Sequence, residues 1–492
     1  MRKAYALLTL PLLLAIGCGD DTAAPGDMAP DLSHTVDPLA IACTDSVDSV
    51  YQLPANLPAF DPSHRGDIIR CAFDRALPAA TVNTALTTLG YTGPAVHSDL
   101  NVYRIAYRTE RVQGSASAAP GGVSSALVLM PSNHRTDAYV VTAHGTVGLA
   151  DSCVPSKFNL ADGTTGEDAQ VFDLALPGDG WITIAPDYAG FGYGGPVSGW
   201  SLAEDEAHSL LDATRAMKNF LQPTALPPKV AFMGHSQGAH AVLSVQPLIA
   251  TYGSASPVIG VAPMGVLWVS DRSWGASIDP PIGITTSNAP YVVAYSMYYF
   301  YSHGELYDGP GHGLDMFKAS QRDAVKTLLT TSCDDNALAG KIQALGAQPS
   351  DIYDDPFWMP VANCMIFNAG CATDPAKTWL ARAKADRPAI DPAGPPILFW
   401  HGLQDTTISP GRAQCGIDKI ETDLAGAANP TATLTVCGDP GATHSSIVRR
   451  DIDYVSQWIA ARAAGMPNPA GCGPFAAADG GTFTCTEPPP ND

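Results

Sequence analysis

One stretch, residues 230–243, limits what this chain can fold into more than any other. It reads Val-Ala-Phe-Met-Gly-His-Ser-Gln-Gly-Ala-His-Ala-Val-Leu, so an apolar run leads into a turn sequence and then into an alanine-rich segment. This order predicts a strand, a sharp turn and a helix, the arrangement called a nucleophile elbow. Gly234 and Gly238 flank Ser236 because a side chain at either position would collide across so tight a turn. The bare pentapeptide also occurs in plain loops, but the flanking segments favour the elbow.

The composition indicates a large folded protein. The chain has 492 residues, 46% of them hydrophobic, which can fill two or three domain-sized units. Its formal net charge of −21 makes nucleic acid an improbable partner, because the phosphate backbone would be repelled. The acidity has a plain explanation in a solvated acidic surface, and it also fits an exported protein.

The first residues are typical of an export signal. A short basic start precedes an apolar run, residues 6–16, that is too short to span a bilayer. The run ends in Leu-Ala-Ile-Gly-Cys, which resembles the lipobox of bacterial lipoproteins, although Ala15 stands where leucine is usual. We expect residues 1–17 to be removed, Cys18 to carry a lipid that anchors the protein in the cell envelope, and residues 18–40 to form a flexible tether. Ordinary secretion is the alternative.

The other ten cysteines form an even set in a chain bound for an oxidising compartment, which favours five disulfides. A zinc site is not indicated, because no two cysteines have Cys-x-x-Cys spacing with histidines nearby. We expect neither a metal nor a cofactor. Connectivity cannot be deduced from sequence, but pairing of neighbours suggests Cys43–Cys71, Cys364–Cys371, Cys415–Cys437, Cys472–Cys485 and, by remainder, Cys153–Cys333.

Alternating strands and helices predict an α/β fold with a mostly parallel central sheet and helices on both faces. Residues 41–100, rich in turns and proline, are expected to wrap this core. Its first part is assigned to residues 101–269, with strands expected at 102–108, 124–130, 138–143 and 180–188 and a helix at 202–221.

The alternation breaks in residues 270–392, where an inserted helical cap is expected. This segment holds a tyrosine-rich run, residues 291–301, and a helical stretch, residues 315–330. The tyrosines could line a substrate site or fill a core of the cap itself. The sheet resumes in residues 393–465, and a cysteine-bounded tail, residues 466–492, follows.

An acid and a histidine stand where an elbow fold needs them. Asp405 follows an apolar strand and is expected to orient the histidine, whereas Asp386 and Asp391 precede that strand and are weaker candidates. His444 lies after the last strand, and among the histidines beyond the serine it alone is both last in order and on such a loop. Asp187 precedes the serine, so we expect it to order its own loop, because the chain order is Ser, Asp, His.

An oxyanion hole needs two backbone N–H groups. Gln237, the residue after the serine, is expected to supply one of them. The loop His-Gly-Thr-Val-Gly at residues 144–148 is expected to supply the other, through Thr146 with Gly145 as its neighbour. A plain turn is the alternative for this loop.

With these residues in hand, the chain resembles the secretory lipase family of α/β-hydrolases. The matching features are Gly-His-Ser-Gln-Gly at 234–238, Gly-Trp-Ile-Thr-Ile-Ala-Pro-Asp-Tyr at 180–188, His-Gly-Leu-Gln-Asp at 401–405 and His444. The resemblance covers roughly residues 100–465. It implies an α/β-hydrolase fold, hydrolysis of acyl esters or lipids, and a cap over the acyl site.

We therefore expect a serine carboxylic-ester hydrolase, a lipase or esterase, that works through an acyl-enzyme. Ser236 would attack, His444 would carry the proton and Asp405 would hold the imidazole. Two alternatives stay open. One is a serine peptidase with the same triad. Such a peptidase can use an acidic pair to recognise a free amino terminus, and residues 204–206 could imitate that pair. The other is a surface-binding lipoprotein without catalysis.

Overall fold

The computed structural model describes residues 37–112, 121–158, 160, 168–193, 197–268, 270–279, 289–428 and 430–487. The expected signal peptide, Cys18 and all but the last residues of the expected tether lie outside these ranges. Among the helices that are described, none combines the length and the apolar character needed to cross a membrane.

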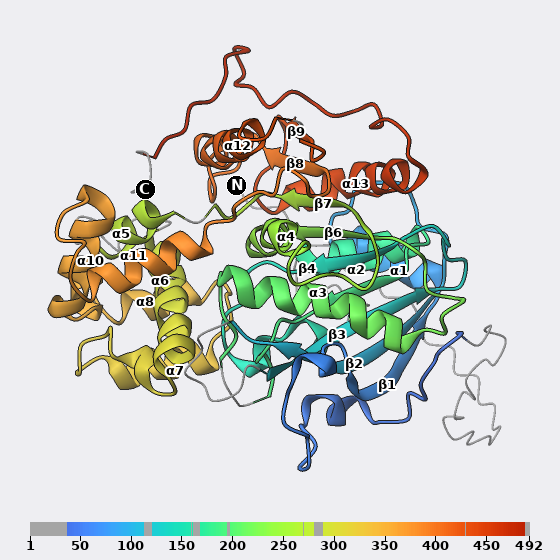
Figure 1. Cartoon of the computed structure of the whole chain (residues 1–492), viewed down its shortest axis with the longest axis horizontal. Helices are drawn as coiled ribbons and strands as arrows, with labels where there is room; N and C mark the ends of the chain where they lie inside the picture. The colour runs from blue at the N-terminus through green and yellow to red at the C-terminus, as the bar shows by residue number, and fades with distance from the viewer. Residues whose placement is uncertain are drawn as a thin grey trace, which may run out of the picture. The chain divides into compact units, whose positions relative to one another are not determined.

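One sheet organises the body of the chain (Figure 1). In the described ranges it has nine strands in the order β1-β2-β3-β5-β4-β6-β7-β8-β9. The pairings from β1 to β5 are antiparallel, and those from β5 through β4 to β9 are parallel. The strands are β1 (Ile68–Leu77), β2 (Leu100–Glu110), β3 (Gly121–Pro131), β4 (Tyr139–Ala143), β5 (Thr183–Pro186), β6 (Val230–His235), β7 (Val258–Met264), β8 (Ile397–Gly402) and β9 (Leu434–Asp439).

Helices cover both faces of the sheet. The continuous apolar run of β6 is buried along its whole length, as a central parallel strand requires. On one face pack α1 (Ala79–Thr88), α2 (Asp168–Gly178) and α13 (Ser446–Ala464). On the other pack α3 (Ala203–Phe220), α4 (Gln237–Leu248) and α12 (Pro410–Ala425). This architecture is the α/β-hydrolase fold that the sequence predicts.

Strand β1 is a feature that the sequence did not suggest. The segment expected to wrap the core contributes this strand to the sheet edge, paired with β2 along its length. Its register shifts twice, between Ile68 and Arg70 and between Phe73 and Arg75. These irregularities break the two-residue alternation by which strands are predicted.

The cap between β7 and β8 is helical and has a core of its own. Trp274, Tyr298, Tyr299 and Phe300 are buried together in it. The helix expected at residues 315–330 begins only at Arg322. The cap helices are α5 (Asp271–Ile278), α6 (Ala289–His303), α7 (Arg322–Thr331), α8 (Leu338–Gln343), α9 (Pro349–Ile352), α10 (Asp355–Phe367) and α11 (Ala376–Asp386). Short 3-10 turns occupy Val47–Tyr51, Pro62–His64, Asp151–Cys153, Pro155–Lys157 and His312–Leu314, and a π turn occupies Gly304–Asp308.

The disulfides confirm three of the five expected pairs and overturn two. Cys43–Cys71, Cys153–Cys333 and Cys364–Cys371 form as expected. The expected Cys415–Cys437 and Cys472–Cys485 are wrong, because the bonds are Cys415–Cys485 and Cys437–Cys472.

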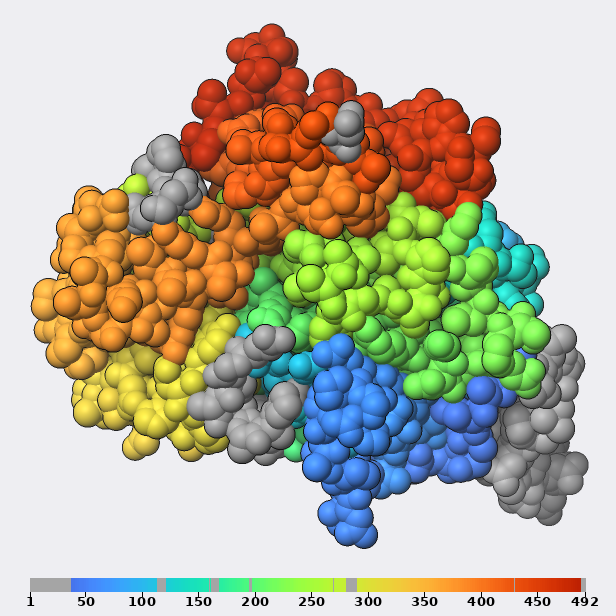
Figure 2. Space-filling model, viewed as in Figure 1, coloured from blue at the N-terminus to red at the C-terminus, as the bar shows by residue number. Residues whose placement is uncertain are grey.

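The path of the tail explains the exchange of partners. The tail runs back over the sheet, where the N–H of Gly438 donates to the carbonyl of Gly473 at 2.9 Å. It then crosses to α12, where the N–H of Thr486 donates to the carbonyl of Gly411 at 3.1 Å. Cys472 therefore lies beside Cys437 of β9, and Cys485 lies beside Cys415 of α12. In Figure 2 the tail, in red, lies at the top of the view on the outside of the orange residues.

Candidate active site

Ser236 stands on the sharp turn between β6 and α4. Its backbone has φ 57° and ψ −117°, a conformation that is strained for any residue with a side chain. Gly234 and Gly238 make the turn possible. A Cβ atom on Gly234 would lie 2.2 Å from the carbonyl oxygen of Gly238, and one on Gly238 would lie 2.0 Å from the carbonyl oxygen of Ala143, so neither glycine could carry a side chain.

The structure brings the three predicted residues together. Nε2 of His444 lies 3.0 Å from Oγ of Ser236, and Nδ1 of His444 lies 2.7 Å from Oδ2 of Asp405. The serine comes from the end of β6, the acid follows β8, and the histidine follows β9. These parallel strands end at the same edge of the sheet, which is why residues separated by more than 200 positions meet.

Asp405 is held for this contact. Its Oδ1 accepts hydrogen bonds from the backbone N–H groups of Thr407 and Ile408, both at 2.8 Å. Burial raises the pKa of the Asp405 carboxyl, but the hydrogen bond and charge of His444, helped by His401, outweigh it and leave the pKa below its usual value. The carboxylate is therefore charged where it faces the imidazole.

The weaker candidate acids lie elsewhere. Asp386 accepts hydrogen bonds from Tyr299 and faces His303 at 2.8 Å. Asp391 accepts from the backbone N–H of Ala393 at 2.8 Å. Asp187 is buried, and its carboxylate joins its loop to two other segments, since Oδ2 accepts from the hydroxyl of Ser125 on β3 and Oδ1 from the N–H of Ser156.

The loop after β4 lies against the elbow. A Cβ atom on Gly145 would stand 3.3 Å from the Cβ of Ser236. Thr146 lines the same space as the serine, and its hydroxyl accepts a hydrogen bond from the indole N–H of Trp200 at 3.1 Å. This contact fixes the side chain of Thr146 beside Ser236. The backbone N–H of Thr146 is the donor expected to help bind the oxyanion.

Gln237 belongs to a buried polar network that local sequence patterns did not reveal. Its side-chain amide donates to Oε1 of Glu206 at 2.7 Å, and Nδ1 of His240 lies 3.0 Å from Oε2 of the same carboxylate. Burial raises the pKa of Glu206 despite these hydrogen bonds. The network anchors the residue after Ser236 to α3, and no spacing in the sequence predicts such a contact between helices.

His235 is a close neighbour of His444 that the sequence did not single out. Its Nε2–H donates to the backbone carbonyl of His444 at 2.9 Å, and the two rings lie 4.7 Å apart. Burial lowers the pKa of His235 to about 4. A neutral His235 can therefore hold the loop of His444 in place without adding a positive charge beside it.

Two cavities meet at Ser236. The first, of about 370 Å³, is lined mainly by apolar and aromatic side chains, among them Leu267, Trp268 and Ile408. The second, of about 590 Å³, is polar and includes His444 and Asp334. The tyrosine-rich run divides accordingly: Tyr291 and Tyr295 line both cavities, whereas residues 298–301 are buried in the core of the cap.

Known proteins resemble this chain in fold and, over one segment, in sequence. The secretory lipase family matches residues 157–271, which confirms the resemblance over the elbow region. The ligand-bound rice cell wall degrading esterase LipA from Xanthomonas oryzae has a TM-score of 0.58 and 16% identity, and covers 81% of this chain and 97% of that chain. Candida antarctica lipase A in its closed state has a TM-score of 0.58 and 16% identity, and covers 89% of this chain and 91% of that chain. At such identities the likeness is one of fold. A comparison with curated proteins gives no match.

Proposed function

We propose that the protein is a serine carboxylic-ester hydrolase that works through an acyl-enzyme. The observation that carries the proposal is the hydrogen-bonded series from Ser236 through His444 to Asp405 on a strained elbow. A hydroxyl within reach of an imidazole, itself oriented by a buried carboxylate, is the arrangement that activates serine as a nucleophile.

The geometry supports a simple sequence of steps. Oγ of Ser236 attacks the ester carbonyl while Nε2 of His444 takes its proton, and Asp405 stabilises the imidazolium that results. The backbone N–H groups of Gln237 and Thr146 would hold the oxyanion. His444 then returns the proton to the leaving alcohol, and water hydrolyses the acyl-enzyme by the same route.

The cavities favour an ester with an apolar acyl group. The apolar cavity beside Ser236 would receive the acyl chain, since burial of apolar surface contributes about 25 cal/mol per Å². The secretory lipase match and the esterase and lipase folds support a lipid or acyl-ester substrate. A panel of p-nitrophenyl esters of graded chain length would distinguish lipase from small-ester esterase.

A peptidase is disfavoured because two of the three acids at residues 204–206, Asp205 and Glu206, are buried and already paired. Oδ1 of Asp205 accepts from Nε of Arg111 at 2.8 Å in the interior, and Glu206 is committed to Gln237. Both carboxylates are 1% exposed, so a substrate cannot reach them. The intact hydrogen-bonded triad likewise speaks against a purely binding role.

The disulfides and the match to a secretory family support export of the protein. We further propose that Cys18 carries the lipid that anchors it to the cell envelope. Cys18→Ser should then move the protein from the membrane fraction to the soluble fraction. A variant that stays with the membranes would contradict the anchor.

Labelling with a fluorophosphonate tests the catalytic proposal directly. The wild-type protein should be labelled at Ser236 and should hydrolyse p-nitrophenyl esters. Ser236→Ala should lose both properties, with kcat lower by about 10⁶. The control is Ser445→Ala. Ser445 lines the polar cavity beside Ser236, but it takes no part in the hydrogen bonds that join Ser236, His444 and Asp405. Activity of Ser236→Ala above about a hundredth of wild type would refute the assignment.

A further inference from the structure

The described part of the C-terminal tail, residues 466–487, lies outside the segment that matches the secretory lipase family, yet it contacts side chains that line the cavity beside Ser236. The Cys415–Cys485 disulfide ties its end to the first turns of α12. The next residue, Thr486, packs closely on Gly411. A Cβ atom added to Gly411 would lie 2.4 Å from Cγ2 of Thr486. Residues 485 and 486 of the tail are therefore fixed against α12.

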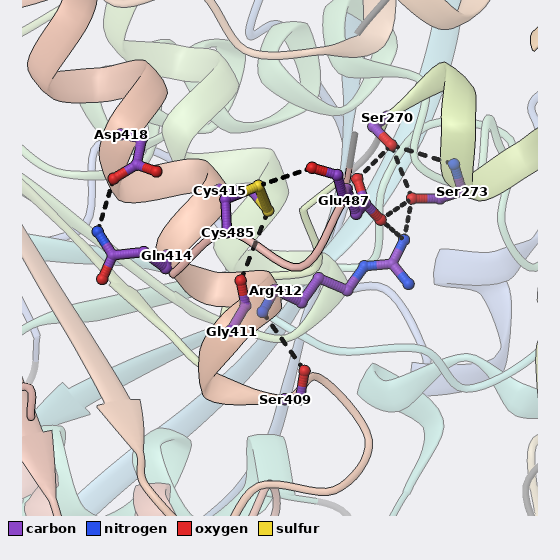
Figure 3. The surroundings of a disulfide bond; sticks show 10 residues. All are labelled: Ser270, Ser273, Ser409, Gly411, Arg412, Gln414, Cys415, Asp418, Cys485 and Glu487. Carbon is purple, nitrogen blue, oxygen red and sulfur yellow. Dashed lines mark hydrogen bonds and ion pairs between the residues drawn. A yellow bond between two sulfur atoms is a disulfide. The ribbon is translucent and has the colours of Figure 1, made fainter. Parts of the chain in front are cut away.

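Glu487 follows this anchor and points its carboxylate between the core and the cap (Figure 3). Oε1 lies 2.9 Å from a guanidinium nitrogen of Arg412 and accepts from the hydroxyl of Ser273 at 2.5 Å, while Oε2 accepts from Ser270 at 2.6 Å. Arg412 also donates to Ser273. Ser270 is the N-cap of α5, so the carboxylate lies where the helix dipole favours a negative charge.

This cluster forms part of the wall of the apolar cavity. Arg412 and Ser273 line that cavity together with Ser236. Among the described residues that line it, Arg412 is the one with a charged side chain. The side chain of Arg412 is 32% exposed and that of Glu487 is 15% exposed, so the two charges compensate each other in a partly dry environment. Without this partner the cavity wall would present an uncompensated cation.

We propose that Glu487 determines the acyl specificity of the enzyme by neutralising Arg412 in the cavity wall. The inference rests on the ester hydrolysis proposed above. With Glu487 in place the cavity suits an uncharged acyl chain. Without it, Arg412 would attract an acyl chain that ends in a carboxylate, because guanidinium and carboxylate form strong charge-assisted hydrogen bonds. The tail disulfide keeps Glu487 at this position.

Two substrates of equal acyl length test the proposal. The measured quantity is the ratio of kcat/KM for p-nitrophenyl hydrogen adipate to that for p-nitrophenyl hexanoate. Glu487→Gln should raise this ratio about tenfold, because it leaves Arg412 without a counter-charge. Arg412→Gln should lower the ratio, since it leaves Glu487 to repel the substrate carboxylate. The double variant Arg412→Gln with Glu487→Gln should return the ratio close to that of the wild type.

The control variant is Asp479→Asn, which changes the charge of the tail by the same amount at a residue whose carboxylate accepts from the N–H of Gly481. Its ratio should equal that of the wild type. If Glu487→Gln and Arg412→Gln both leave the ratio unchanged while fluorophosphonate labels them, the specificity role of Glu487 is refuted and the ester hydrolase stands. If the wild type neither hydrolyses hexanoate nor accepts the label, the proposed function itself fails. If only one of the two single variants folds, it still tests the proposal, because each has its own expected direction: the kcat/KM ratio rises in Glu487→Gln and falls in Arg412→Gln.

Discussion

Gly238 lies against the end of β4, where a Cβ atom would stand 2.0 Å from the carbonyl oxygen of Ala143. The first turn of the elbow helix and the strand that leads into the loop of Gly145 and Thr146 are thus in backbone contact. A change at this point must move one of them, and both carry residues proposed to bind the oxyanion.

Gly238→Ala should therefore reduce both activity and stability. We expect a loss of at least about tenfold in kcat/KM and a lower Tm, because an overpacked site typically costs about 1–3 kcal/mol. Gly340→Ala is the matched control, since nothing lies within 4 Å of a Cβ atom at Gly340. Thermal unfolding and ester hydrolysis measured on both variants check the expectation, which fails if Gly238→Ala behaves like the control.

Asp405→Asn should lower kcat by about 10⁴ with little change in fold, because the amide cannot stabilise the imidazolium of His444. Asp391→Asn should keep activity close to the wild-type level, since Asp391 has its contacts away from the triad. Initial rates on a single short-chain ester suffice for the comparison. A damaging Asp391→Asn beside an active Asp405→Asn would show that the acid is wrongly assigned.

The cap is expected to govern chain length through Tyr295, which lines both cavities and donates to Asp334 at 3.1 Å. Tyr295→Ala should enlarge the acyl site and shift preference to longer chains. Each methylene that finds room contributes about 0.8 kcal/mol, or about fourfold in kcat/KM. Phe367→Ala, at an exposed aromatic of the cap, is the control.

Labelling of Ser236 by a small fluorophosphonate should remain near the wild-type rate in both cap variants. An unchanged chain-length profile in Tyr295→Ala would assign this part of the cap to packing alone. Parallel loss of labelling and of hydrolysis would instead show that the substitution disturbs the triad.

Asp173 gives a prediction about pH. Burial raises the pKa of its carboxyl to about 7, although the hydroxyl of Thr142 donates to it at 2.8 Å. The folded protein thus holds a proton that the unfolded chain releases near pH 4. The stability that this group contributes is present below pH 4 and declines as pH rises to about 7.

Asp173→Asn removes that decline. In urea denaturation, the free energy of unfolding of the variant minus that of the wild type should be larger at pH 8 than at pH 5. The difference between variant and wild type is the proper readout, because buried histidines such as His144 and His401, with pKa values lowered to about 4, act in the opposite sense. Asp323→Asn, at an exposed site on α7, should show no such pH dependence of the difference.

The sequence predicted the elements whose signal is local. Ser236 is marked by its glycines, and Asp405 and His444 by their places after apolar strands. Glu206 could not be found in this way, because its contact with Gln237 joins side chains of two helices without any fixed spacing. The partners of Cys472 and Cys485 depend on the path of an irregular tail, and nearness along the chain is a poor guide to that path.

The cap has a buried core that is distinct from the two cores on the faces of the sheet. It leaves the sheet after β7 and returns before β8, so the strand order is complete without it. Substitutions in the cap core that do not touch Leu149 and Trp200, which pack into it from outside the cap, therefore need no matching substitutions in the cores of the sheet. Over evolutionary time such a protein can change the cap side of the cavity proposed to bind the acyl group while Ser236, His444 and Asp405 keep their positions.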